Sequence, residues 1–262
     1  MHQICTDLGD EHVSLDSIVA NLDSGDWLRP TPAPGWTIAD QISHLWFFDQ
    51  RALLAATDVE AFVADMQLLI SGSGGVEASV IPGRAISSGE LLESWRADRI
   101  RLLDAASSMD PAARIPWYGP SMSARSFVTA RLMETWAHGQ DIADALSLVR
   151  VPTRRLKHIA HLGVRARPFS YRLNGRELPD ADVAVDLTAP DGSVWHWGDS
   201  ADGSPSITGS ALDFCLVVTQ RRHWTDTDLC VVGDQAVEWI SIAQAFAGQP
   251  GGGRLPGQFA AG

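Results

Sequence analysis

The chain has 262 residues, of which 45% are hydrophobic, and its 20 Lys and Arg against 32 Asp and Glu give a formal net charge of −12. A surface this acidic repels phosphate backbones, so nucleic-acid binding is not expected, and no apolar run reaches the roughly 20 residues of a membrane span. The first residues lack the pattern of a signal peptide and the cysteines, Cys5, Cys215 and Cys230, form no CxxC pair, which favours a reducing, cytoplasmic setting over a disulfide framework or a cysteine zinc site.

The first half of the chain carries apolar residues at helical spacing, separated by loops rich in Pro and Gly. Thr37 with Asp40 predicts a capping box at the start of one helix, and Ser88 and Ser123 are the predicted caps of two later helices. The predicted main helices cover residues 11–22, 38–57, 88–109 and 124–146, with a further helical stretch at 59–70. Amphipathic helices of this length predict an antiparallel four-helix bundle over residues 1–150.

A break at Pro152 opens a region of different periodicity. After a basic helix over residues 153–167, apolar and polar residues alternate as in strands that bury one face. The predicted strands cover 183–187, 193–197, 206–208 and 229–232, and the predicted helices cover 211–220 and 235–247. We therefore expect a smaller α+β domain over residues 151–250, followed by a flexible tail, rich in Gly and Pro, at 251–262.

The last bundle helix contains two side chains with the spacing of metal ligands. Glu134 and His138 stand at i and i+4 and point the same way, so a carboxylate and an imidazole can share one divalent ion. Asp141 lies on the same face and could accept the second ring N–H of His138, as carboxylates beside metal sites often do. The candidate third ligand is His44, in the apolar middle of the 38–57 helix. Two His and one carboxylate leave positions open, which is typical of catalytic zinc.

The same residues allow simpler interpretations. Glu and His at this spacing are frequent on solvated helix faces, and a single core histidine is often satisfied by a backbone carbonyl. From spacing alone, a metal site, a solvent-exposed pair and a packed core histidine all stay open.

Two segments bear a resemblance that favours the metal site. These segments, PGWTIADQISHL at residues 34–45 and ETWAHGQD at residues 134–141, resemble the DinB-like superfamily and, within it, the mycothiol-dependent maleylpyruvate isomerase branch. The resemblance covers about residues 10–148. It implies a four-helix bundle that holds zinc or a related divalent ion with His44, Glu134 and His138, and it places Asp141 beside the ion.

The resemblance extends to the second half, where that branch carries a domain similar to sterol-carrier-like folds. The branch shows Gly-Arg at the end of a helix, whereas this chain has Gln220-Arg221 followed by Arg222. The resemblance implies that Arg221 or Arg222 reaches the metal cleft and binds a carboxylate of the substrate or the thiol. The alternative is that both arginines only end a helix and interact with its dipole.

These observations predict a divalent-metal enzyme that works with a low-molecular-weight thiol. The resemblance implies mycothiol as cosubstrate and cis–trans isomerisation, or S-transfer to a small electrophilic substrate, as the reaction. In this interpretation Arg221 or Arg222 orients the reactant and Asp141 orients the site. One alternative is a metal-activated hydrolase of a small amide or ester with Asp141 as base, and another is a non-catalytic module that binds a metal and a small ligand. We expect small-molecule partners, neither nucleic acid nor a membrane.

Overall fold

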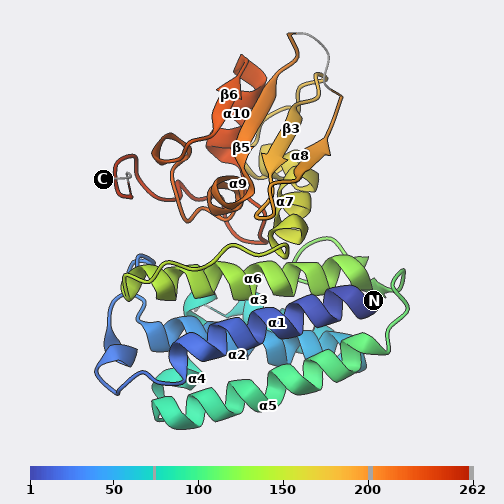
Figure 1. Ribbon diagram of the computed structural model, residues 1–262. Coiled ribbons are helices and arrows are strands. Elements are labelled where there is room, and N and C mark those ends of the chain that lie inside the picture. Colours follow the sequence, from blue (N-terminus) through green and yellow to red (C-terminus); the bar gives the residue numbers. More distant parts are fainter. Residues whose placement is uncertain (73–74, 200–202, 260–262) are drawn as a thin grey trace. The chain divides into compact units, whose positions relative to one another are not determined.

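The computed structural model describes residues 1–72, 75–199 and 203–259 of the chain (Figure 1). The chain divides into two compact units, Met1–Arg150 and Val151–Gly262, which are called unit 1 and unit 2 below. Within the described ranges, no helix combines the length and the apolar composition that crossing a membrane requires.

Unit 1 is built, in its described part, around four long helices. These are α1 (His2–Val19), α2 (Ile38–Thr57), α5 (Ser88–Ser107) and α6 (Ala124–Ala145). Helices α1 and α2 each pack against both α5 and α6. Their apolar faces meet in a core that includes Leu15, Ile42, Leu91, Trp95 and Ile142. The four-helix bundle predicted from the helical periodicity is confirmed.

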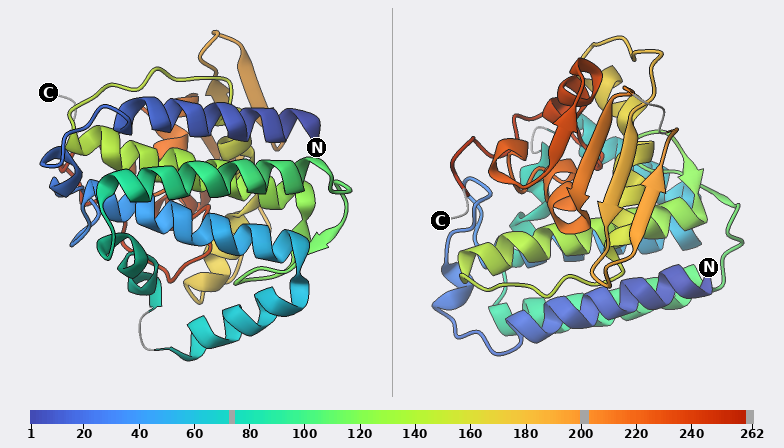
Figure 2. Two further views of the ribbon diagram at one scale, coloured as in Figure 1. Left: turned by 90° about the horizontal axis from the view of Figure 1, so that it is seen from below. Right: turned by 45° about the horizontal axis from the view of Figure 1, so that its top comes forward.

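The chain between α2 and α5 crosses the length of the bundle. Helix α3 (Val59–Ser71), the 3-10 turn η2 (Gly75–Ser79) and the short helix α4 (Ile81–Arg84) carry it back to the end where α2 begins (Figure 2). As a result, α5 packs against α2 and runs parallel to it. The antiparallel order expected from the sequence does not hold for this pair, because the predicted 59–70 stretch belongs to a crossover connection.

Capping boxes fix the starts of the two parallel helices. Thr37 Oγ1 accepts a hydrogen bond from Asp40 N, and the Asp40 carboxylate accepts one from Thr37 N, as predicted for α2. Ser87 and Glu90 make the same pair of bonds at α5. The cap of α5 is therefore Ser87 and not Ser88.

Other boundaries in unit 1 also differ from the predictions. Helix α1 begins at His2 rather than near residue 11, because Ile4, Cys5 and Leu8 continue its buried stripe between exposed polar residues. The 3-10 turn η1 (Asp26–Leu28) follows α1. A short antiparallel pair, β1 (Arg114–Ile115) and β2 (Met122–Ser123), precedes α6. The cap of α6 is Ser123, as predicted.

Unit 2 has an α+β fold, and its described residues form a mixed four-stranded sheet in the order β4-β3-β5-β6. The strands are β3 (Ala184–Thr188), β4 (Val194–Trp197), β5 (Ser206–Ser210) and β6 (Cys230–Val232). Strand β3 pairs antiparallel with β4 and parallel with β5, and β6 pairs antiparallel with β5. The helical elements are α7 (Leu156–Arg165), α8 (Arg167–Leu173), α9 (Ala211–Val218), η3 (Trp224–Asp226) and α10 (Asp234–Ile242). The predicted α+β class is confirmed.

Some predicted boundaries in unit 2 shift. The helix expected over 153–167 is divided into α7 and α8, because Pro168 fits only the first turn of a helix. Helix α10 ends at Ile242, before the predicted residue 247. In the segment predicted as a flexible tail, Gly257 N and Phe259 N donate hydrogen bonds to the Asp226 carboxylate over 2.8 and 3.4 Å, and residues 260–262 lie outside the described part of the chain.

Candidate metal centre

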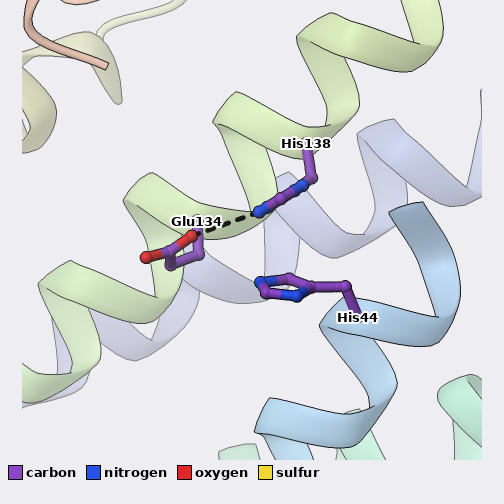
Figure 3. Close-up of side chains that lie close together, drawn as sticks. All are labelled: His44, Glu134 and His138. Carbon is purple, nitrogen blue, oxygen red and sulfur yellow. Dashed lines mark ion pairs between the residues drawn. The ribbon is translucent and has the colours of Figure 1, made fainter. Parts of the chain in front are cut away.

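Three side chains from two bundle helices meet in unit 1. His44 lies on α2, and Glu134 and His138 lie one turn apart on α6. One ligand atom of each lies within 4.8 Å of those of the other two (Figure 3). Both imidazoles are buried, with His44 8% and His138 7% exposed. A search of the described residues for clustered His, Cys, Asp and Glu side chains that could hold a metal ion gives these three. We call it the metal-ligand cluster.

The orientation of the His44 ring follows from a chain of hydrogen bonds. Its Nδ1 atom lies 2.8 Å from Ser79 Oγ, and Ser79 Oγ donates its single hydrogen to the Val76 carbonyl over 2.6 Å. Ser79 must therefore accept the hydrogen bond from His44. On this hydrogen-bond assignment, neutral His44 is the Nδ1–H tautomer, and its Nε2 is an acceptor that points into the cluster.

A second chain of hydrogen bonds assigns the tautomer of His138. Its Nδ1 lies 2.5 Å from Gln41 Oε1, while Gln41 Nε2 donates to Thr31 Oγ1 over 2.9 Å. Thr31 Oγ1 in turn donates to the Trp36 carbonyl over 2.9 Å. Because the Gln41 carbonyl oxygen can only accept, His138 also carries its proton on Nδ1. Its Nε2 lies 3.3 Å from Glu134 Oε2.

The Nδ1 atom of His138 bonds Gln41, a residue that the sequence did not single out. Asp141, which was expected as the partner of this atom, is buried on α6. Sequence reasoning missed both Gln41 and Ser79. Gln41 precedes His44 by three residues and so lies on the same side of α2, a signal that could have been used. Ser79 has no such signal, because it reaches His44 from the crossover connection.

The atoms presented to the centre of the cluster are all hydrogen-bond acceptors. They are Nε2 of His44, Nε2 of His138 and the carboxylate of Glu134, each with a lone pair directed inward. Acceptors that face one another are stabilised by a cation. Two neutral imidazoles with a carboxylate match the ligand set of catalytic zinc and suit several related divalent ions. The donor set therefore fits the metal implied by the resemblance, with positions left open for a reactant.

Aromatic rings enclose the two histidines. The His44 and His138 ring centroids lie 4.4 Å apart, and Trp36 packs on both, at 5.1 and 6.1 Å. Phe48, one turn after His44 on α2, packs on the ring of His44 at 4.7 Å. These apolar faces lower the local dielectric, so electrostatic interactions with a bound ion are stronger than they would be in water.

The two candidate arginines belong to unit 2, in the turn that follows α9. Arg221 Nη1 donates to the Thr219 carbonyl over 2.6 Å, and the Arg222 guanidinium lies 3.9 Å from the ring centroid of Phe259. Gln220, just before them, has a φ of 61°, the left-handed conformation that glycine adopts most easily at a helix end.

The comparisons with known proteins identify the family of this chain and agree with its fold. Residues 8–143 match the family model of the mycothiol maleylpyruvate isomerase N-terminal domain, and this range contains the whole metal-ligand cluster. Two Mycobacterium tuberculosis proteins, uncharacterized protein MT0041 of strain CDC 1551 and uncharacterized protein Rv0036c of strain H37Rv, are each 47% identical to this chain over 249 residues, 95% of this chain and 96% of theirs.

Solved structures share the fold. The crystal structure of the mycothiol-dependent maleylpyruvate isomerase superposes with a TM-score of 0.58 at 13% identity, over 84% of this chain and 89% of the other. A histidine-to-alanine mutant of that isomerase gives a TM-score of 0.57 with the same coverage. The chain belongs to the mycothiol maleylpyruvate isomerase family, which its N-terminal domain defines.

Proposed function

We propose that this protein is a divalent-metal enzyme that uses mycothiol, or a similar thiol, to isomerise a small electrophilic substrate or to transfer sulfur to it. The observation that supports this most directly is the inward-facing set of acceptors, in which Ser79 and Gln41 hold both imidazoles with Nε2 toward the cluster. Family membership supports the thiol, since the solved isomerases of similar fold are named as mycothiol-dependent.

Each candidate residue has a role in this proposal. His44, Glu134 and His138 hold the divalent ion, which we propose is zinc, and leave open positions for a reactant. A bound divalent ion would lower the pKa of a coordinated thiol and so supply a thiolate at neutral pH. Arg221 or Arg222 binds a carboxylate of the substrate or the thiol, and Asp141 orients the reactants. A reduced intracellular thiol as cosubstrate fits a cytoplasmic location.

Metal analysis with a thiol titration tests the proposal. The purified protein should contain about one equivalent of divalent metal, and His44→Ala and His138→Ala should each lose it. His196→Ala, which changes an exposed histidine of unit 2, serves as control and should keep the metal. A full equivalent of metal in both cluster variants would reject the site.

Cobalt substitution separates the candidate reactions. Thiol added to the cobalt protein should produce a sulfur-to-cobalt charge-transfer band, and turnover should depend on the thiol. Turnover without thiol would favour a metal-activated hydrolase. Bound metal with neither response would favour a non-catalytic binding module.

The arginine variants test the assignment in unit 2. We expect Arg221→Ala to keep the metal and to lower kcat/KM, because a bidentate contact to a carboxylate is lost. If Arg222→Ala has this effect instead, the alignment of the family's arginine is wrong by one position.

A further inference from the structure

Part of the crossover connection, residues 75–84, binds two adjacent residues of α2. Ser79 Oγ accepts from His44 Nδ1 at 2.8 Å, and the Ser79 carbonyl accepts from Ser43 Oγ at 2.9 Å. Ser43 Oγ in turn accepts from Gly83 N at 3.0 Å. Ser43 is fully buried and Ser79 is 1% exposed, so these bonds are shielded from water. We call residues 75–84 the crossover clamp.

The close contact between the clamp and α2 requires glycine at position 83. A Cβ atom added to Gly83 would lie 2.4 Å from Ser43 Cβ and 2.5 Å from Ser43 Oγ. Contacts this short do not occur, so any side chain here pushes the clamp away from α2. Glycine is therefore required at position 83 because of its contact with Ser43, the residue directly before the candidate metal ligand His44.

Two further bonds join the clamp to the surroundings of the cluster. Trp36 Nε1 donates to Glu77 over 2.9 Å, and Trp36 is the ring that packs on both imidazoles. Arg84 forms an ion pair with Asp40, the capping-box partner of Thr37 at the start of α2, with Nε 2.7 Å from Oδ1. The clamp therefore contacts the start of α2, the aromatic cover and one imidazole of the cluster.

From these contacts we infer that the crossover clamp is a positioning element of the metal centre, and that metal binding and clamp packing stabilise each other. Ser79 holds His44 in the Nδ1–H tautomer with Nε2 directed at the ion. Any contribution of the clamp to metal affinity must appear equally as a contribution of the metal to clamp packing, since coupling between two binding events is reciprocal. The inference rests on the proposed function in requiring a metal at the cluster.

The first experiment compares Ser79→Ala with Ser107→Ala by titrating each protein with Zn²⁺ against a competing chelator. Ser107 is a matched control, because its hydroxyl donates only to a carbonyl of its own helix, over 2.8 Å. We expect Ser79→Ala to weaken Zn²⁺ binding about 10–100-fold, as loss of an imidazole's orienting partner does, and Ser107→Ala to leave it unchanged.

The second experiment compares Gly83→Ala with Gly89→Ala in the same titration. An added Cβ at Gly89 meets no atom within 4 Å. We expect Gly83→Ala to weaken Zn²⁺ binding at least about tenfold, while Gly89→Ala does not. Hydrogen exchange of the folded wild-type protein adds a reciprocal readout, since Zn²⁺ should slow exchange at the backbone N–H of Gly83.

The outcomes distinguish this inference from the proposed function. If the wild-type protein binds no divalent metal, the proposed function fails and the inference fails with it. If the wild-type protein binds Zn²⁺ and both Ser79→Ala and Gly83→Ala bind it equally well, only the positioning role is overturned. A purely structural role would lower the stability of the metal-free variants but would leave the affinity of the folded protein, and the metal-dependent exchange at Gly83, unchanged.

Discussion

Asp49 of α2 and Arg131 of α6 form a buried ion pair between the two helices that carry the metal-ligand cluster. Arg131 Nη2 lies 2.8 Å from Asp49 Oδ1, and Trp95 Nε1 donates to Asp49 Oδ2 over 3.2 Å. Asp49 is fully buried and Arg131 is 4% exposed. Burial raises the pKa of Asp49, and the Arg131 charge opposes that rise. The pair thus fixes how α2 and α6 meet beside the cluster.

Arg131→Met should therefore be strongly destabilising. Without Arg131 the Asp49 carboxylate is buried without its partner charge, which costs about 3–5 kcal/mol, whereas Asp49→Leu combined with Arg131→Met should cost less. Urea unfolding measures both. Arg101→Met is the control, since Arg101 is 68% exposed in its pair with Asp98 and should contribute less than about 1 kcal/mol. Equal losses for Arg131→Met and Arg101→Met would contradict the role of the buried pair.

Gln41→Leu should weaken metal binding more than Asp141→Asn does. The leucine leaves the Nδ1 hydrogen of His138 without its acceptor, so we expect a loss of about 10–100-fold in affinity. Asp141→Asn should change the affinity little, because the structure gives that hydrogen bond to Gln41. Chelator competition on the two purified variants checks this, and the reverse order would restore Asp141 as the partner of His138.

His12 should make the fold sensitive to acid. It is 1% exposed, and within the described part of the chain neither ring nitrogen has a hydrogen-bond partner. Burial, with the charges of Arg99 and Arg131, lowers the pKa of His12 to about 3. Since the unfolded chain binds this proton near pH 6.5, the free energy of unfolding should fall as the pH drops from about 6.5 to 3, by up to about 1.4 kcal/mol per pH unit from this group.

The variant His12→Phe isolates that contribution. Urea unfolding at several pH values should give a shallower acid limb for His12→Phe than for the wild-type protein. His2→Phe, at an exposed position, should leave the slope unchanged. Parallel acid limbs for wild type and His12→Phe would show that other groups govern the acid response.

Gln220→Gly should stabilise unit 2. The φ of 61° strains a residue with a Cβ, and glycine removes about 1 kcal/mol of that strain. The hydrogen bonds that the Gln220 side-chain amide donates are long, at 3.4–3.5 Å, so their loss lowers the stability little. Thermal unfolding should show a higher midpoint for Gln220→Gly and a lower one for Thr219→Gly, whose φ of −94° needs no glycine.

The parts of the site that sequence predicts are those set by local geometry. The spacing of Glu134 and His138 fixes their proximity within one helix, and apolar periodicity places His44 on an inward face. The roles of Gln41 and Ser79 depend on tertiary structure. Ser79 reaches His44 only because the crossover connection turns back along α2, and a hydroxyl in a Ser-rich, Gly-rich stretch carries no local mark of such a contact.

Dependence on tertiary structure also explains why the observed fold differs in places from the predicted one. Periodicity predicts that a helix buries one face, but not the direction in which it runs, so the parallel arrangement of α2 and α5 could not be predicted. The capping box at Thr37, which depends on residues three apart, was predicted correctly, whereas the cap of α5 was predicted at Ser88 and lies at Ser87. The pair β1 and β2 was missed because its two-residue strands are too short to show alternation.

The division of the chain into two units places the candidate metal ligands and the candidate arginines in different halves of the sequence. All the cluster residues, with Gln41 and Ser79, belong to unit 1, whereas Arg221 and Arg222 belong to unit 2. Substitutions in unit 2 leave all the candidate metal ligands unchanged. Under the proposed function, changes in the second half of the gene could alter which reactant is bound without altering the residues proposed to hold the ion.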